Sequence, residues 1–327
     1  MTAKWQPLID LVGSTSRLLL TTHMRPDGDG LGSMKALALA LRALGKETRL
    51  VIPTHLPERY AFLDPEAEFV HFEKRSDGFL DGVEGVIVLD TGTWNQLGKV
   101  GEWLRGAAVP KLVIDHHLTQ DDLGAARIVD TGAEATGRLT FEAIQALGGQ
   151  VTPAAASALF VALAMDTGWF RHSNTTAATH ELAAQLVAAG AQPDLLYQQL
   201  FEQSSLGRLK LTGKVLERLT LTAGGWVATS QVRLTDYALT GALPPDSEDL
   251  VNYTLTIKGV KVGMLLMEQP AGGVKVSLRS RCKLNVGRLA EEFGGGGHAA
   301  AAGAIIHAPM EEVEQRLLLR LLHLLEP

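Results

Sequence analysis

Four runs of apolar residues in this chain end in an aspartate or a histidine, and this repeated junction constrains the fold more than any other feature. LLLTTH ends in His23, VIVLD in Asp90, LVIDHH reaches Asp115, and VALAMD ends in Asp166. Continuous apolar runs are typical of parallel strands covered on both faces, and we assign the first three runs to such strands. Open α/β sheets bind ligands beside the carboxyl ends of their strands, so these side chains are expected to share one site.

The turn after the first run brings an imidazole and two carboxylates close together. It reads HMRPDGDGLGS over residues 23–33, with Asp27 and Asp29 two positions apart. If this segment is locally extended, the two carboxylates point to opposite sides, so that one turn could serve two neighbouring cations. The alternative is an Asp-Gly turn with a capping His23. The other three junctions favour the metal site, since chance rarely ends four apolar runs in this way.

Helical patterns alternate with the apolar runs and predict a doubly wound sheet. Met34–Leu44 reads as a helix with Ser33 at its N-cap, and Pro153–Met165 as a helix that delivers Asp166. Further strands are expected at 48–52 and 126–129, and further helices at 135–147 and 174–191.

From Leu219 onward the pattern changes to short strands separated by glycine turns. A hairpin is expected from 220–222 and 226–232, followed by strands at 253–257, 262–267 and 274–278. The predicted fold class is α/β, with a doubly wound parallel-sheet domain followed by a smaller mixed α/β domain. The expected bounds are 1–190 for the first domain, 191–214 for a helical connector and 215–327 for the second domain.

Two motifs together resemble a known family. The triplet Asp115-His116-His117, with the His23 turn, resembles the DHH phosphoesterase superfamily. The segment GGGGHAAAAG over 294–303 resembles the glycine-rich motif of the associated DHHA1 domain. The resemblance covers nearly the whole chain. In length and layout it is closest to the nanoRNase group, the oligoribonucleases that also act as pAp phosphatases.

The resemblance implies a pair of divalent cations. One cation would be held by His23, Asp27 and Asp90, and the other by Asp29, Asp90, His116 and Asp166. Asp90 would therefore bridge the two. Mixed carboxylate and imidazole ligation without thiolates favours Mn²⁺, with Mg²⁺, Co²⁺ and Zn²⁺ as alternatives.

The expected catalytic residues are Asp90, Asp115 and His117. In the family, the histidine that matches His117 faces the substrate phosphate. Asp115 would orient an imidazole through its other nitrogen, although a simple cap at the end of a strand explains it equally well.

The second motif implies a grip on the substrate. Arg279 and His298 match family positions that hold the terminal phosphate, whereas Arg281 could equally be a surface residue. A glycine run exposes backbone N–H groups and lets a phosphate approach closely. The chain departs from related motifs by carrying alanines at 299, 300 and 302, which removes side-chain donors. The expected substrate-binding residues are Arg279, Arg281, Gly295, Gly296, Gly297 and His298.

Composition narrows the partners. The net charge of -6 argues against tracking of long nucleic acid. Between Val251 and Gly303, seven Lys or Arg residues face three Glu residues, which suits a short anionic ligand or, alternatively, a solvated face. The single cysteine, Cys282, suits a reducing compartment and a packing role. No apolar stretch approaches the roughly 20 residues of a membrane helix, so a cytoplasmic location is expected.

These features predict a metal-dependent phosphodiesterase that degrades short RNA or DNA oligonucleotides to mononucleotides. The same enzyme would also dephosphorylate a nucleotide bisphosphate, 3′-phosphoadenosine 5′-phosphate. A linear or cyclic dinucleotide phosphodiesterase and a non-catalytic nucleotide sensor are the alternatives. A manganese inorganic pyrophosphatase would share the first domain, but the GGGH motif argues against it. The oligomeric state, including a homodimer, stays open.

Overall fold

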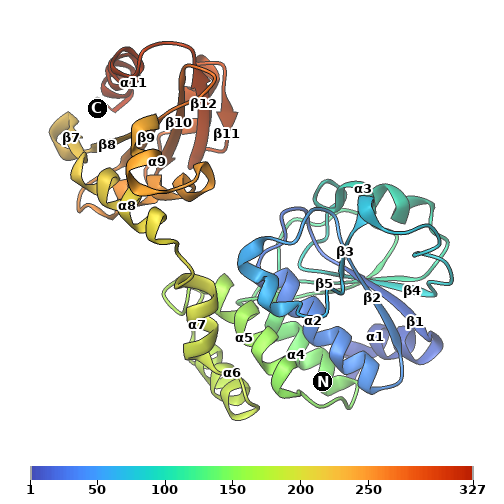
Figure 1. Ribbon diagram of the computed structural model, residues 1–327. Coiled ribbons are helices and arrows are strands. Elements are labelled where there is room, and N and C mark those ends of the chain that lie inside the picture. Colours follow the sequence, from blue (N-terminus) through green and yellow to red (C-terminus); the bar gives the residue numbers. More distant parts are fainter. Residues whose placement is uncertain (1, 326–327) are drawn as a thin grey trace. The chain divides into compact units, whose positions relative to one another are not determined.

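The computed structural model describes residues 2–325, which divide between Gln203 and Ser204 into two compact units, here called unit 1 and unit 2. Each unit holds one six-stranded sheet (Figure 1). This confirms the predicted α/β class, with a parallel sheet first and a mixed sheet second. Within 2–325, no helix has the length and apolar character needed to cross a membrane.

The sheet of unit 1 is parallel throughout, with the strand order β3-β2-β1-β4-β5-β6. The chain reverses its winding direction between the neighbouring strands β1 and β4, which is where doubly wound folds bind ligands. The strands are β1 (Arg17–Thr21), β2 (Glu47–Ile52), β3 (Phe69–His71), β4 (Gly85–Leu89), β5 (Lys111–Asp115) and β6 (Ala126–Val129).

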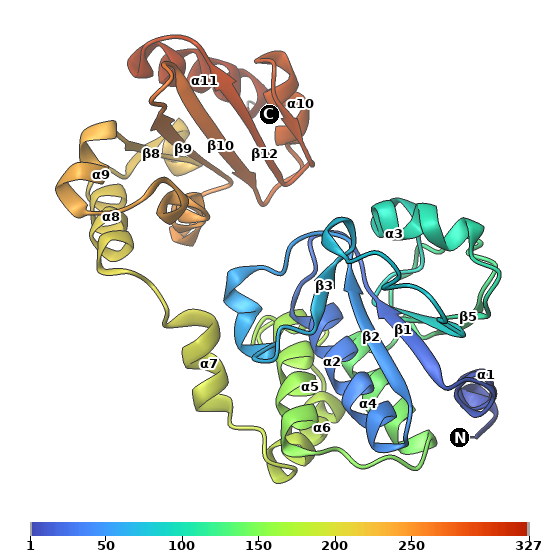
Figure 2. The ribbon, with the colours of Figure 1, turned by 45° about the vertical axis from the view of Figure 1, so that its right-hand side comes forward.

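Helices cover both faces of this sheet because its strand side chains alternate between two cores. Leu18 and Leu20 pack with α1, α2, α4 and α5, whereas Leu19 packs with α3 on the opposite face (Figure 2). The helices are α1 (Thr2–Ser14), α2 (Gly28–Ala43), α3 (Trp94–Gly106), α4 (Thr136–Ala146), α5 (Pro153–Asp166), α6 (Ala177–Ala188) and α7 (Pro193–Phe201), with the 3₁₀ turns η1 (Glu58–Leu63) and η2 (Phe72–Lys74).

The helices α2 and α5 pack closely and carry two of the predicted metal-ligand positions. A Cβ at Gly32 would lie 2.3 Å from the carbonyl oxygen of Ala158, so this crossing requires glycine. The predicted start of the first helix at Met34 is wrong. The helix begins at Gly28, because the Asp27 side chain caps it and Ser33 lies inside it. The prediction of a helix that delivers Asp166 is confirmed by α5.

The sheet of unit 2 has the order β11-β12-β10-β9-β8-β7 and is mixed. Only the pair β8–β9 is parallel among the described strands of this sheet, and β7–β8 forms the predicted hairpin. The strands are β7 (Thr220–Thr222), β8 (Val227–Val232), β9 (Val262–Glu268), β10 (Val274–Ser280), β11 (Gly296–Gly297) and β12 (Ala301–Ile306).

Two cores flank this second sheet. One lies under α10 and α11, and the other under α8 and the 3₁₀ segment η5. The predicted strand at 253–257 is wrong, because η5 occupies this segment and buries Leu250, Val251 and Thr254 at helical spacing. The remaining elements are α8 (Leu206–Glu217), η3 (Ala223–Gly225), α9 (Leu234–Thr240), η4 (Pro244–Ser247), η5 (Leu250–Thr256), α10 (Val286–Glu292) and α11 (Met310–Leu325).

Candidate metal centre

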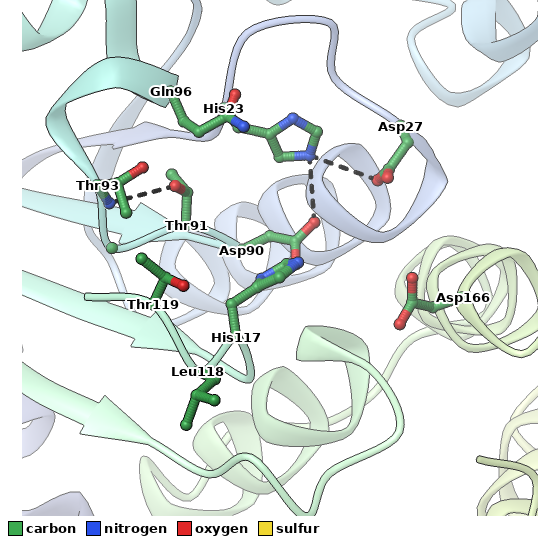
Figure 3. Close-up of a pocket in the computed structure, with 11 residues that line it drawn as sticks. His23, Asp27, Asp90, Thr91, Thr93, Gln96, His117, Leu118, Thr119 and Asp166 are labelled. Carbon is green, nitrogen blue, oxygen red and sulfur yellow. Dashed lines mark hydrogen bonds and ion pairs between the residues drawn. The ribbon is translucent and has the colours of Figure 1, made fainter. Parts of the chain in front are cut away.

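The candidate site lies at the carboxyl edge of the unit 1 sheet. His23 follows β1, Asp90 follows β4, and β5 ends in Asp115 with His116 and His117 directly after it. These strands are neighbours in the sheet, so their ends bring the side chains together. A cavity of about 440 Å³ lies at this edge. Figure 3 shows the side chains that line it. Its lining residues are His23, Asp27, Asp90, Thr91, Gly92, Thr93, Gln96, His117, Leu118, Thr119 and Asp166.

The turn after β1 places its two carboxylates at the start of α2. Asp27 Oδ1 accepts hydrogen bonds from the backbone N–H groups of Asp29 and Gly30, at 3.0 and 3.1 Å. Asp29 lies in the first helical turn and is buried, and it accepts from the N–H groups of Thr136 and Gly137 at 2.7 and 2.8 Å. The segment is therefore extended at Asp27 but not at Asp29, because the helix starts at Gly28.

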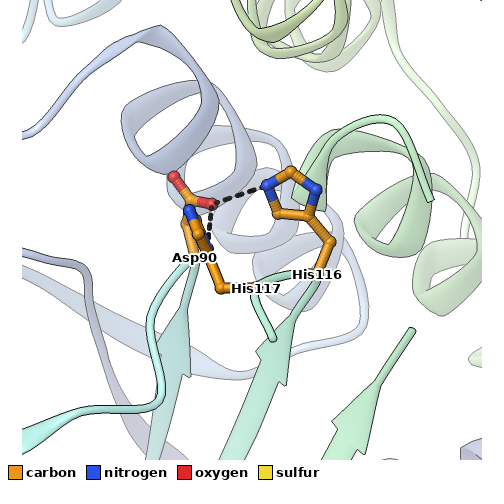
Figure 4. A group of neighbouring side chains, drawn as sticks. All are labelled: Asp90, His116 and His117. Carbon is orange, nitrogen blue, oxygen red and sulfur yellow. Dashed lines mark ion pairs between the residues drawn. The ribbon is translucent and has the colours of Figure 1, made fainter. Parts of the chain in front are cut away.

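Asp90 lies at the centre of the site and is only 2% exposed. Its Oδ2 is 3.3 Å from His23 Nε2, and its Oδ1 is 3.7 Å from His116 Nε2. The Thr136 hydroxyl donates to the same Oδ1 at 3.0 Å. Figure 4 shows Asp90 facing the imidazoles of His116 and His117. One carboxylate therefore reaches two histidines on opposite sides, as a bridging ligand must.

Potential ligand atoms form a first group of His23, Asp27 and Asp90 and a second group of Asp29, His116 and Asp166. Asp90 also groups with His116 and His117, and its Oδ1 lies 3.7 Å from His116 Nε2. In the first, His23 Nε2 lies 3.6 Å from Asp27 Oδ1 and close to Asp90. In the second, His116 Nε2 lies 3.8 Å from Asp29 Oδ2 and 3.4 Å from Asp166 Oδ2. Ligand atoms around one small divalent cation stand roughly 3–3.5 Å apart, given metal–ligand bonds near 2.1 Å. Both groups therefore have about the spacing that a cation needs.

The histidine tautomers also suit metal ligation. Nδ1 of His116 donates to the Ala133 carbonyl oxygen at 3.1 Å, and Nδ1 of His23 donates to the Met24 carbonyl oxygen at 2.9 Å. In the neutral rings each Nε2 then carries a lone pair directed at the carboxylates. His116 Nε2 is buried and has no hydrogen-bond partner within residues 2–325. A cation would satisfy this atom.

Electrostatics point the same way, because several carboxyls are buried close together. Burial raises the pKa of Asp29 well above its usual range, and the charges of Asp90 and Asp166 add to the effect. Burial likewise raises the pKa of Asp166 to about 6. Burial lowers the pKa of His23, but hydrogen bonds to Asp27 and Asp90 outweigh it and raise the pKa to about 11. Protons bound by these groups reduce the repulsion between the carboxylates, and a divalent cation would reduce the same repulsion.

Asp115 is fully buried and anchors His117. Its Oδ1 accepts from His117 Nδ1 at 2.8 Å, and its Oδ2 accepts from Gln120 Nε2 at 2.5 Å. The hydrogen bond to Asp115 raises the pKa of His117 to about 9. The His117 side chain remains 55% exposed, so its Nε2 can meet a ligand. Gly92 makes room for Gln120, because a Cβ there would lie 1.7 Å from Gln120 Oε1.

Backbone strain concentrates around the site. Arg25, Asp90, Trp169 and Phe170 all have positive φ angles, between 55° and 63°. Arg25 lies between two of the candidate ligands, and the two aromatic residues follow Asp166 in a left-handed turn. Non-glycine residues in this region are strained, and such strain commonly accumulates at functional sites.

In unit 2, the predicted substrate-binding residues lie around one end of the neighbouring strands β10, β12 and β11. Arg279 on β10 pairs in register with Ala301, and His298 forms the turn before Ala301. Nε of Arg279 donates to Asn252 Oδ1 at 3.1 Å, and its Nη2 lies 3.6 Å from Asp249 Oδ1. The exposed Arg281 follows β10.

The glycine run has a packing role within unit 2. Gly296 and Gly297 form β11, and a Cβ at Gly295 would lie 2.1 Å from the Gly303 carbonyl oxygen. At Gly297, where φ is +144°, a Cβ would lie 2.6 Å from the Ala301 carbonyl oxygen. These glycines therefore allow β11 and the preceding residue to lie directly against β12.

Sequence reasoning missed three residues that support the site. Thr136 and Gly137 bind Asp29 and Asp90, and Gln120 holds Asp115. A Thr-Gly pair at the start of a helix, whose free N–H groups favour carboxylates, was the available signal for the first two. Nothing in the local sequence singles out Gln120.

Comparison with known proteins agrees with this geometry. Residues 17–165 match the model of the DHH family, N-terminal domain, and residues 236–326 match that of the DHHA1 domain. A Thermus thermophilus protein named bifunctional oligoribonuclease and PAP phosphatase NrnA is 31% identical, over 92% of this chain and 88% of that protein. A Bacillus subtilis protein of the same name is 26% identical, over 92% of this chain and 93% of that protein.

Two further relatives extend this comparison. The cyclic-di-AMP phosphodiesterase GdpP of Geobacillus thermodenitrificans is 25% identical over 95% of this chain, which spans 48% of that protein. The crystal structure of an exopolyphosphatase-related protein from Bacteroides fragilis superposes with a TM-score of 0.84 at 24% identity, covering 100% of this chain and 98% of that one.

Proposed function

This chain belongs to the DHH family, and we propose that it is a two-metal phosphoesterase that hydrolyses short oligonucleotides to mononucleotides. We propose that the same site also dephosphorylates 3′-phosphoadenosine 5′-phosphate. The T. thermophilus and B. subtilis relatives carry both activities in their names. The observation that carries the proposal is the position of Asp90, which belongs to one ligand group and contacts His116 of the other.

In this proposal, His23, Asp27 and Asp90 hold one divalent cation, and Asp29, Asp90, His116 and Asp166 hold the other. We favour Mn²⁺, because carboxylates and imidazoles without thiolates suit it. Bound cations of this kind lower the pKa of water and draw negative charge from a phosphate.

The chain's own residues complete the proposed chemistry. Asp115 fixes His117 through Nδ1, which leaves Nε2 available to a phosphate oxygen. The hydrogen bond to Asp115 raises the pKa of His117, and a protonated His117 would donate a charge-assisted hydrogen bond to the phosphate. The nearly complete burial of Asp90 excludes water from one side of the ligand groups.

We assign substrate binding to the second part of the chain. Residues 1–190 would form the catalytic domain, 191–214 the connector and 215–327 the substrate-binding domain. Arg279 and His298 would hold the terminal phosphate, with Arg281 and the N–H groups of Gly295, Gly296 and Gly297 nearby in the sequence. The fixed guanidinium of Arg279, held by Asn252, supports this role.

A labelled dinucleotide tests the proposal. With Mn²⁺ the protein should convert it to mononucleotides, and it should release phosphate from 3′-phosphoadenosine 5′-phosphate. Asp166→Asn should abolish both reactions, whereas Asp122→Asn makes the same chemical change outside the ligand groups and should leave them intact. Tight binding of the dinucleotide without turnover would contradict an enzymatic role and favour a nucleotide sensor.

A second candidate function is the cleavage of cyclic dinucleotides, which the similarity to GdpP favours. Parallel rates on cyclic di-AMP and on its linear dinucleotide distinguish the two. We expect the linear substrate to be cleaved faster. Faster cleavage of the cyclic substrate would reverse the assignment.

A further inference from the structure

A cluster of aromatic side chains lies beside the candidate metal centre in unit 1. The chain is poor in aromatic residues, with 9 Phe, 5 Trp and 4 Tyr in all. Several of them nevertheless meet where the end of α5 approaches α7. The Trp169 ring lies 5.1 Å from the Tyr197 ring and 5.5 Å from the Phe201 ring, centroid to centroid. The cluster comprises Phe160, Trp169, Phe170, Tyr197 and Phe201.

Two of these rings face outward. Tyr197 and Phe201 are one helical turn apart on α7, with ring centroids 4.9 Å apart, and are 40% and 42% exposed. The inner side of α7 is anchored by Leu196 and Leu200, which are each only 7% exposed. The two rings contact Trp169 and yet stay 40% and 42% exposed, and large aromatic rings left open to solvent in this way favour a binding role.

An exposed cation borders the Phe201 ring. The Arg59 guanidinium carbon lies 5.8 Å from the centroid of the Phe201 ring, and Arg59 itself is exposed. Rings with a neighbouring guanidinium suit a ligand that combines a flat base with a phosphate. A purely apolar protein segment would leave this charge without a partner.

The cluster is tied to the candidate metal centre from two sides. Trp169 follows Asp166 by three residues in a left-handed turn. On the other side, η1 carries Arg59 and packs against both α2 and α7. Next to Arg59, burial raises the pKa of Tyr60, and the nearby charge of Asp27 acts in the same direction. A nucleotide on these rings would thus lie against segments that directly adjoin those carrying Asp27 and Asp166.

We propose that Arg59, Tyr197 and Phe201 form a stacking platform for a nucleobase of the oligonucleotide substrate. The base would stack on the exposed rings, and Arg59 would meet the attached phosphate. The proposal rests on the proposed function, since it names where that substrate is held. It assigns recognition of a base to unit 1, in addition to the phosphate grip proposed for unit 2.

The test compares a dinucleotide with an analogue in which one base is missing. Stacking of a base on aromatic rings tolerates any base sequence. Loss of the rings weakens the affinity for the nucleotide by about 5- to 150-fold. In the double variant Tyr197→Ala/Phe201→Ala, the KM for the dinucleotide should rise within this range while kcat changes little. For the abasic analogue, the KM of the double variant should remain close to the KM of the wild-type protein.

Control variants separate stacking from a folding defect. Tyr197→Phe keeps the ring and should keep the wild-type KM. Leu195→Ala removes another exposed apolar side chain of α7, which is 49% exposed, and should also change nothing. Equal KM values for wild type and the double variant would overturn the proposal. A changed elution volume in size-exclusion chromatography without a changed KM would overturn it in favour of an interface between copies.

The platform can be judged even if the proposed function fails. If the wild-type protein binds the dinucleotide without cleaving it, dissociation constants are measured in place of KM. The dissociation constant of the double variant should then exceed that of wild type by the same factor. Quenching of Trp169 fluorescence, taken as the difference from Trp169→Phe, reports this binding because the indole touches the platform rings. A wild-type protein that neither binds nor cleaves the dinucleotide would overturn both proposals.

Discussion

Replacing Gly92 by alanine is expected to remove one of the hydrogen bonds that hold Asp115 without changing any proposed metal ligand. The added Cβ would lie 1.7 Å from Gln120 Oε1 and 2.4 Å from its Cδ, so the Gln120 side chain must leave its place. The amide then no longer donates to Asp115 Oδ2, from which Nε2 stands at 2.5 Å. A hydrogen bond to a charged group contributes about 1.5–3 kcal/mol, and we expect the free energy of unfolding to fall by that amount.

A double-mutant cycle checks this reasoning. Gln120→Ala removes the same hydrogen bond without a clash and should cause a similar loss of stability. In the Gln120→Ala background, Gly92→Ala should add less than about 0.5 kcal/mol, because no amide remains to be displaced. Urea unfolding of the four proteins gives the values. If the stability losses of Gly92→Ala and Gln120→Ala simply add in the double variant, the two residues are not coupled and the explanation is refuted. Turnover should fall in both single variants, since His117 depends on Asp115 for its orientation.

Three further results are expected. Arg279→Gln should raise the KM for a dinucleotide and leave Mn²⁺ binding unchanged, with Arg288→Gln as the matched control, and an unaltered KM would count against the phosphate grip. RNA of two to five nucleotides should be hydrolysed faster than a twenty-nucleotide strand, since the acidic chain offers little extended basic surface; a rate that climbs steadily with length would show otherwise. In EDTA, the melting temperature should fall as pH rises from about 6.5 to 9. Folding raises the pKa of His23 to about 11 and that of His117 to about 9. The stability that these two histidines contribute is therefore complete below about pH 6.5 and is lost as they deprotonate. A flat or rising profile would contradict these shifts.

The sequence predicts that these candidate residues meet, because apolar runs in a parallel sheet must end at one edge. The strands before Asp90 and Asp115 and the helix that ends in Asp166 are present as expected. Local pattern suffices here, since burial on both faces produces the runs and parallel pairing aligns their ends.

Other features depend on contacts between segments that are distant in the sequence, so local sequence patterns do not predict them. The helix after β1 starts at Gly28 because the Asp27 side chain caps it, although the glycine-rich turn favours a later start. The N–H groups that bind Asp29 come from Thr136 and Gly137, more than a hundred residues away. The aromatic platform joins η1 to α7 in the same long-range manner.

Asp90 is proposed to join two metal positions, and the number of Mn²⁺ ions bound per chain tests this role. Mn²⁺ bound per chain, measured by calorimetry together with dinucleotide turnover, should be two for wild type. Asp90→Ala should bind fewer ions and lose turnover, while its circular dichroism spectrum is retained because Asp90 lies after the end of β4. An Asp90→Ala protein that lacks the second ion and still hydrolyses the dinucleotide at the wild-type rate would contradict the account.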